Sequence, residues 1–467
     1  MFWGREKELS NLNARYNNDN FECAIIYGRR RVGKTELIKE FIKNKKHIFF
    51  SAVEGTERRN IDLLSGSIYR SISGKNSLSS PRHEDFAACL EQISDYSWEG
   101  KLIFVIDEYP YFAKSEKSIS SILQHYIDHK FQYRDFMLIL CGSSMSFMEN
   151  QVMGYQSPLY GRRTCQYKIL AFDYITSSSF FENFTKEEKA IIHTITGGIP
   201  KYLLQFNDNN SIDENIIDNY FTPSSFLYEE PQNLLKQELR EPQIYKDIIT
   251  AIATGASKMS EIISKVNING FDSAKCNKYL SSLMSLGIVK REVPVLSKEN
   301  SRNSIYRIND GMFRFWYCFV YNNTSAIEFG DGTMVYERLK NAITNFMGEA
   351  FEGIAKEYLW QQNVANRLPI KFDNCGRWWG NNPFEKKEQE IDLVAYNKNE
   401  KKAIFAECKW TNKQVDSRIL KRLIQKSEMF DFEEKFYMIF SKSGFTDDVR
   451  EIADSDDMIS LVSFDEM

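Results

Sequence analysis

The chain has 467 residues, which at roughly 150 residues per domain is enough for about three domains. Hydrophobic residues make up 42% and charged residues 27%, with only 10 Pro and 23 Gly, which excludes extended disorder, collagen and mucin-like stalks. The net charge of −4 gives no overall positive field, so any surface that attracts nucleic acid must be local.

Cysteine spacing and hydropathy indicate where the protein resides. The eight cysteines form no CxxC pair and no closely spaced set typical of a zinc site, which favours buried reduced thiols. The most apolar aromatic run, residues 313–321, is far shorter than the roughly 20 residues that span a bilayer. The first residues do not resemble a signal peptide. We therefore expect a cytoplasmic protein without a membrane partner.

Short apolar runs alternate with amphipathic stretches from residue 23 to about residue 204. The runs CAIIY, HIFFSA, KLIFVID and FMLILCG have the length and composition of buried strands. Strands that alternate with helices in this way predict an α/β fold with a parallel sheet.

A phosphate-binding loop follows the first of these strands. Its sequence GRRRVGKT matches the pattern GxxxxGK[ST] and lies between a strand and the helical segment ELIKEFI, as this motif requires. The glycines let the backbone wrap around an anion, the lysine reaches the β- and γ-phosphates, and the threonine hydroxyl serves Mg²⁺. The predicted ATP-binding residues of the loop are Gly28, Arg29, Arg30, Arg31, Val32, Gly33, Lys34 and Thr35.

An acidic pair ends a later apolar strand of the same region. Asp107 and Glu108 follow LIFVI, and an acidic pair after a phosphate-binding loop fits Mg²⁺ and water chemistry. We predict that Asp107, with Thr35, holds the Mg²⁺ shell. Glu108 is the predicted catalytic residue that polarises the attacking water.

The motifs FWGREKEL, YGRRRVGKT, IDEYP, LILCGSS, LYGRR and TGGIPKYL occur in this order. Together they resemble the archaeal-type P-loop ATPases of the AAA+/STAND assemblage over about residues 1–230. The resemblance implies a helical lid whose motif 197–200 contacts nucleotide. It also implies that Ser143 or Ser144 senses the γ-phosphate and that Arg162 or Arg163 is an arginine finger. For these two arginines a surface salt bridge is the alternative.

Residues 240–312 have the outline of a winged helix-turn-helix, with three short helices followed by a hairpin. Residues 243–310 contain ten Lys and Arg against six Asp and Glu, a local charge of +4. We expect Lys275 and Lys278 on the third helix, and Lys298 and Arg302 on the wing, to contact DNA phosphates. A protein-interaction or purely structural module is the alternative. The aromatic connector at 313–340 favours core packing over base stacking.

The C-terminal region, residues 341–467, predicts a small mixed α/β domain. A tight turn at 397–400 would bring Asp392 beside Glu407, and a divalent cation between two such carboxylates relieves their repulsion. Lys409 would lie on the same face as Glu407. This pattern resembles the core of PD-(D/E)xK restriction-endonuclease-like nucleases. The resemblance implies catalytic roles for Lys409 and for the helix residue Glu352.

These observations predict an α/β chain with a P-loop ATPase sheet and helical lid, a winged helix-turn-helix and a restriction-endonuclease-like domain. The expected ligands are ATP with Mg²⁺ at the loop, Mg²⁺ or Mn²⁺ at the second site, and DNA as partner. A homo-oligomer is compatible with this reading. The competing hypotheses are a regulatory ATPase switch that binds without cleaving and a transcription regulator.

Overall fold

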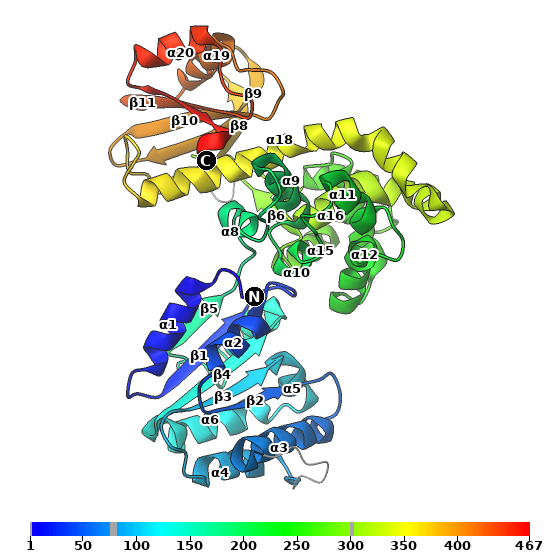
Figure 1. The fold of residues 1–467 in the computed structure, drawn as a ribbon, viewed down its shortest axis with the longest axis vertical. Coiled ribbons are helices and arrows are strands. Elements are labelled where there is room, and N and C mark those ends of the chain that lie inside the picture. Colours follow the sequence, from blue (N-terminus) through cyan, green and yellow to red (C-terminus); the bar gives the residue numbers. More distant parts are fainter. Residues whose placement is uncertain (1, 75–81, 299–302) are drawn as a thin grey trace. The chain divides into compact units, whose positions relative to one another are not determined.

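The computed structural model describes residues 2–74, 82–298 and 303–467. Contacts divide the chain into two compact units (Figure 1). The first comprises Met1–Phe172 with Ile199–Lys201, and the second comprises Asp173–Gly198 with Tyr202–Met467. Apart from residues 199–201, the helices after residue 172, predicted as the lid of the ATPase domain, therefore group with the second unit. The domain boundaries inferred from the sequence stay a prediction.

A five-stranded parallel sheet forms the centre of the first unit, in the order β2-β3-β4-β1-β5. Every residue of β1, β3 and β4 is buried, as expected for strands covered by helices on both faces. The predicted parallel sheet is confirmed. The strands are β1 Glu22–Tyr27, β2 His47–Ser51, β3 Leu102–Asp107, β4 Phe136–Gly142 and β5 Cys165–Lys168.

Helices of the first unit pack on this sheet through apolar faces. Side chains such as Ile61, Leu90 and Leu123 join the strands in one buried cluster. The helix before β3 starts at an N-cap, where Asp85 accepts a hydrogen bond from the Ala88 N–H. The helices are α1 Glu6–Tyr16, α2 Lys34–Ile42, α3 Glu57–Ser73, α4 Phe86–Asp95, α5 Tyr109–Ser115, α6 Ile119–His129 and α7 Met145–Phe147.

Helices dominate the first part of the second unit. Two of them begin with capping boxes, at Thr185 and Ser211, which satisfy their first backbone N–H groups. These helices are α8 Tyr174–Ser178, α9 Lys186–Thr196, α10 Pro200–Leu203, which straddles the division between the units, α11 Ile212–Tyr220 and α12 Phe226–Glu238.

Three helices and an antiparallel hairpin follow in the predicted order. Asp272 caps the third helix by accepting a hydrogen bond from the Lys275 N–H, at 2.9 Å. The elements are α13 Pro242–Ala253, α14 Met259–Val266, α15 Ser273–Ser285, β6 Val289–Glu292 and β7 Ile305–Ile308. Their identification as a winged helix stays a prediction. Arg302, predicted on the wing, lies outside the described residues.

The aromatic connector is part of the core. Phe313, Phe315 and Trp316 are fully buried, and the Trp316 Nε1–H donates to the Tyr228 carbonyl at 2.8 Å. The segment folds as short helical turns, with α16 at Gly311–Phe315 and α17 at Thr324–Ala326. A long helix, α18 Gly332–Val364, follows. It begins 14 residues before the predicted helical run FMGEAFEGIAKEYLW at residue 346.

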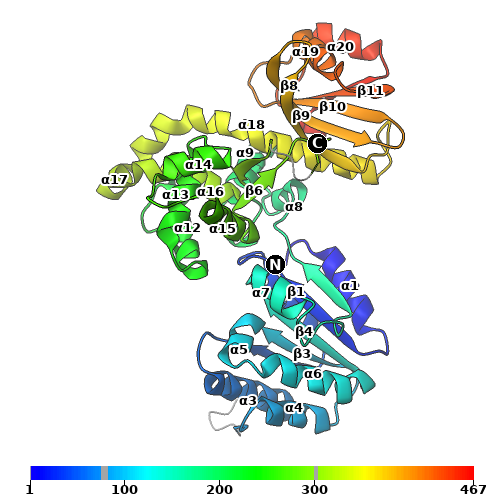
Figure 2. The ribbon, with the colours of Figure 1, turned by 180° about the vertical axis from the view of Figure 1, so that it is seen from behind.

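A mixed five-stranded sheet, in the order β12-β11-β10-β9-β8, ends the chain. Strands β8, β9 and β10 are antiparallel neighbours, whereas β10, β11 and β12 are parallel. Helix α18 covers one face and helices α19 and α20 cover the other (Figure 2). The elements are β8 Asn374–Asn382, β9 Lys387–Asn397, β10 Lys402–Lys409, α19 Ser417–Ser427, β11 Glu434–Ser441, α20 Asp447–Asp454 and β12 Ile459–Ser463.

Two further expectations concern the whole chain. All eight cysteines are free thiols, of which five are buried as predicted and three, Cys165, Cys318 and Cys375, are half-buried. Within the described ranges, no helix combines the length and the apolar character needed to cross a membrane.

Candidate functional site

The predicted phosphate-binding loop lies between β1 and α2, at the carboxyl end of the parallel sheet. Lys34 is 6% exposed, and its ammonium donates to the Gly28 and Arg29 carbonyls, at 2.9 and 2.8 Å. Burial lowers the pKa of Lys34. These bonds hold the ammonium against the loop, where it can instead donate hydrogen bonds to the oxygens of a bound phosphate.

Asp107 and Glu108 stand next to the loop because β3 is a neighbour of β4, which pairs with β1. The Thr35 hydroxyl donates to the Asp107 carboxylate at 2.9 Å, so the two predicted Mg²⁺ residues are in contact. The Ser143 hydroxyl, at the end of β4, donates to the Glu108 carboxylate at 2.7 Å. Ser144 makes no side-chain cap at α7. Of the two predicted sensor serines, Ser143 is therefore the one joined to the acidic pair.

Glu108 has a backbone φ of 51°, in the left-handed region that residues other than glycine rarely adopt. Such strain is typical of sites where a side chain must point in a fixed direction. The strained backbone lies at the junction of β3 and α5, where Glu108 directly precedes the helix. The orientation of the Glu108 carboxylate is thus fixed by β3, by α5 and by the Ser143 hydroxyl.

Contacts around the loop leave little room for larger residues. A Cβ at Gly28 would lie 2.3 Å from the Ile169 carbonyl oxygen, so only glycine fits there. Arg30 donates to the Tyr111 hydroxyl at 2.6 Å, which directs its side chain toward α5. Pro200, in the predicted lid motif, has its Cγ 4.0 Å from the position that a Cβ at Gly33 would occupy.

The two candidate finger arginines lie at the opposite, amino-terminal edge of the sheet, just before β5. Arg162 forms a bidentate ion pair with Asp128 on α6, at 2.9 and 3.1 Å. Arg163 donates to the Met153 carbonyl at 3.0 Å. The ion pair matches the salt-bridge alternative for Arg162, and a finger role stays a prediction for both.

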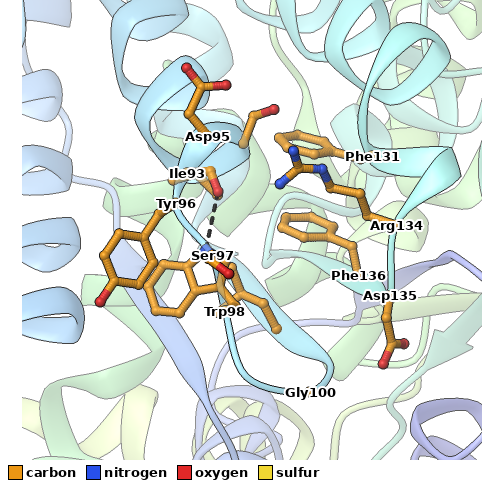
Figure 3. Close-up of a pocket in the computed structure, with 12 residues that line it drawn as sticks. Ile93, Asp95, Tyr96, Ser97, Trp98, Gly100, Phe131, Arg134, Asp135 and Phe136 are labelled. Carbon is orange, nitrogen blue, oxygen red and sulfur yellow. Dashed lines mark hydrogen bonds between the residues drawn. The ribbon is translucent and has the colours of Figure 1, made fainter.

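A cavity of about 390 Å³ opens at the same amino-terminal edge (Figure 3). Its wall includes Tyr96, Trp98, Arg134 and Asp135, and the indole of Trp98 donates to the Ile93 carbonyl at 3.1 Å. No residue predicted for nucleotide binding lines this cavity.

The predicted carboxylates and lysine of the C-terminal sheet lie together. Asp392 on β9 accepts a hydrogen bond from the Cys408 N–H of β10, at 2.8 Å. The Lys409 ammonium lies 2.9 Å from Glu407 and 3.8 Å from Asp392. Asp392 is 6% exposed, and burial together with Glu407 raises its pKa. Two carboxylates and a lysine therefore converge, as the sequence predicts.

Glu352 reaches this cluster from α18. Burial raises the pKa of Glu352 to about 8, and the nearby Asp392 adds to that shift, whereas Arg377 opposes it. Arg377 Nε lies 3.4 Å from the Glu352 carboxylate. The helix glutamate implied by the nuclease resemblance thus lies near the predicted metal ligands.

Two basic residues of this cluster were not predicted from the sequence. Lys426 on α19 is 6% exposed, lies 3.4 Å from the Glu407 carboxylate and donates to the Glu390 carbonyl. Arg377 on β8 pairs with Glu352 and Glu390. Both are brought in by tertiary packing. No motif marks either residue in the sequence.

The side chains present at the two candidate sites determine which metal ions they could hold. No group of three or more His, Cys, Asp and Glu side chains arranged for a metal occurs among the described residues. Mg²⁺ is commonly held by one or two carboxylates together with water and substrate phosphate, and Asp392 and Glu407 supply such a pair. At the loop, Thr35 and Asp107 supply a hydroxyl and a carboxylate.

The strand order, the loop and the Thr35–Asp107 contact define a P-loop ATPase domain. Residues 2–206 match a family model described as an ATPase domain predominantly from Archaea. A solved Walker-type ATPase of Pyrococcus abyssi, PABY2304, is similar in fold, with a TM-score of 0.51 and 19% identity over 68% of this chain and 96% of that chain.

The rest of the chain also has relatives. Residues 316–420 match a family described as archaeal and bacterial proteins of unknown function. The uncharacterized protein MJECL04 of Methanocaldococcus jannaschii is 35% identical over 95% of this chain and 96% of its own length. The chain belongs to the same family as that protein. An uncharacterized ATP-binding protein of the same organism, MJ0423, is 52% identical over 10% of this chain and 78% of its own length.

Proposed function

We propose that the chain binds and hydrolyses ATP at the Gly28–Thr35 loop and couples the nucleotide state to binding and metal-dependent cleavage of DNA by the second unit. The observation that carries the ATPase part is the chain of contacts Lys34–loop, Thr35–Asp107 and Ser143–Glu108. Lys34 and Thr35 begin α2, Asp107 ends β3, and Glu108 and Ser143 directly follow β3 and β4.

Each residue of this chain of contacts has a step in the proposed hydrolysis. Lys34 moves its hydrogen bonds from the loop carbonyls to phosphate oxygens. Thr35 and Asp107 would hold Mg²⁺, which when bound neutralises charge on the phosphates. Glu108 orients the attacking water and accepts its proton, while Ser143 keeps the Glu108 carboxylate in place.

DNA binding is proposed for the three helices and hairpin of residues 242–308. Lys275 and Lys278 lie on the exposed face of α15, although the Lys275 ammonium also donates to the Gly270 carbonyl at 2.7 Å. Lys298, on the connection between β6 and β7, is exposed. Reversing the charges of Lys275 and Lys278 tests this part by the salt dependence of DNA affinity.

The convergence of Asp392, Glu407 and Lys409 supports cleavage as the activity of the second unit. The two carboxylates would hold a divalent cation, which when bound lowers the pKa of a water and polarises the phosphate. Lys409 stabilises the negative charge that develops on that phosphate. Burial lowers the pKa of Lys409, but Glu407 and Asp392 raise it by more, so the ammonium stays charged.

A regulatory switch that binds DNA without cutting it is the second candidate. It is favoured by the pairing of Glu407 with two lysines, Lys409 and Lys426, which already neutralise this carboxylate. One experiment separates the two functions: plasmid nicking by the full chain with Mn²⁺, with and without ATP, beside steady-state ATP hydrolysis. ATP hydrolysis with nicking supports the nuclease, and ATP hydrolysis with DNA binding alone supports the switch.

A further inference from the structure

The hairpin formed by β8 and β9 projects beyond the cluster of Asp392, Glu407 and Lys409. In the antiparallel register, Leu393 pairs with Ala406, so Asp392 is level with Glu407 near the end of β10. Strand β9 starts five residues earlier, at Lys387, and pairs there only with β8. At about 3.4 Å per residue, the tip of the hairpin lies roughly 17 Å past Asp392.

The tip carries an exposed aromatic side chain on an ordered turn. Phe384 is 75% exposed, whereas Asn382 at the base of the turn is 2% exposed. The Asn382 side chain accepts hydrogen bonds from the backbone N–H groups of Phe384 and Glu385, at 2.8 and 3.3 Å. Glu385 accepts a further bond from Gln389, at 2.8 Å. The turn thus presents Phe384 to solvent on a fixed backbone.

Helix α19 lies beside this tip and presents a basic face. Gln425 donates to Glu385 at 3.1 Å, which joins the helix to the hairpin. Residues 418, 421, 422 and 425 recur at helical spacing and are all exposed. Among the described residues, Lys421 and Arg422 have no side-chain hydrogen bond or ion pair, and neither do the exposed Lys386 and Lys387 of the hairpin. Two exposed carboxylates without a side-chain partner stand against these four cations: Glu388 on the hairpin and Glu428, three residues after Gln425, at the end of α19.

The wing side of the three-helix module is continuous with the same hairpin. The Val295 N–H donates to the Arg377 carbonyl of β8 at 2.8 Å, and the Trp379 indole donates to the Asn303 carbonyl at 3.1 Å. The basic wing residue Lys298 therefore belongs to one packed body with β8. The phosphates of a nucleic-acid backbone are the ligand that matches several unpaired cations on one packed body.

We propose that the hairpin tip and the exposed face of α19 form a duplex DNA-binding surface, in which Lys421 and Arg422 contact phosphates and Phe384 inserts between base pairs. Apolar wedges of this kind unstack a base step and kink the duplex. The inference deepens the proposed function, since it names the surface that would hold DNA beside Asp392. It concerns DNA binding by the second unit and is independent of ATP hydrolysis.

The test uses the full chain with a labelled 30-base-pair duplex in EDTA, so that binding is measured without cleavage. The double variant Lys421→Ala/Arg422→Ala should weaken binding about tenfold or more and reduce the salt slope by about two. Its matched control, Lys236→Ala/Lys398→Ala, removes two exposed and unpaired lysines from α12 and from the turn between β9 and β10. The control should leave affinity and slope unchanged.

The wedge is tested by 2-aminopurine placed at successive steps of the duplex. Wild type should raise its fluorescence at one step, Phe384→Ala should abolish that rise, and Phe384→Leu should retain it. Phe329→Ala, which removes a 92% exposed aromatic from the helical turn Ile327–Asp331, is the control. Unchanged affinity, slope and fluorescence in the variants, with wild type still binding DNA, would overturn this inference alone. Absence of DNA binding by wild type would overturn both it and the DNA part of the proposed function.

Discussion

Replacement of Lys34 by alanine is the sharpest test of the nucleotide site. In the present structure the ammonium makes two hydrogen bonds to the Gly28 and Arg29 carbonyls. Nucleotide binding exchanges these for contacts with phosphate oxygens, so the variant loses one charged partner of the bound ATP. A hydrogen bond to a charged group contributes about 1.5–3 kcal/mol. The Kd for ATP should therefore rise by about 10- to 150-fold.

Calorimetric titration with ATP and Mg²⁺ measures this change directly. Lys39→Ala is the matched control, because Lys39 lies on the same helix but is exposed and paired with Glu36. Thermal unfolding of each variant shows whether the loop still folds. A Kd for Lys34→Ala within twofold of wild type, in a variant that unfolds at the same temperature, would refute the assignment of this lysine.

Four further outcomes follow from the same geometry. Glu108→Gln should keep ATP affinity within twofold and slow single-turnover hydrolysis by at least about 100-fold, and an unchanged rate would remove Glu108 from the chemistry. Gly28→Ala should abolish ATP binding, because its Cβ would meet the Ile169 carbonyl at 2.3 Å, and normal binding would contradict the close packing. Asp392→Asn should lose both Mn²⁺ binding, measured by calorimetry, and plasmid nicking. Retention of either would show that Asp392 is not a required metal ligand. Burial lowers the pKa of His193 from 6.5 to about 4. Below pH 6.5 the unfolded chain therefore binds a proton that the folded chain does not, and stability should fall by up to about 3 kcal/mol between pH 6.5 and pH 4. Urea unfolding of wild type and His193→Gln across this pH range measures the free energy of unfolding. Parallel pH profiles for the two proteins would show that His193 does not cause the loss of stability.

Features encoded locally could be predicted from the sequence. The loop GRRRVGKT lies between its strand and helix, and the run LIFVI ends in Asp107 and Glu108, so both motifs carry their own context. The proximity of Asp392 and Glu407 could also be predicted from the sequence. A four-residue turn between two alternating strands fixes their register.

Contacts between distant segments could not be predicted. Lys426 approaches Glu407 only because α19 packs on the sheet, and a lysine on an amphipathic helix gives no sign of this. The start of α18 at Gly332 was missed because its first turns are stabilised by α11, where Asp213 bonds Tyr336 and Lys340. The grouping of the lid helices with the second unit likewise arises from tertiary packing.

The shared use of α18 limits how the chain can be divided. Glu349 of this helix lies 2.9 Å from Arg307 of β7 and 3.3 Å from Arg314 of α16, one turn away from Glu352. A fragment starting at residue 341 would retain Glu352 but expose Glu349 without these arginines and would lose the helical turns anchored at Asp213. We therefore expect the carboxylate cluster and the three-helix module to unfold as one piece, and limited proteolysis should release them together.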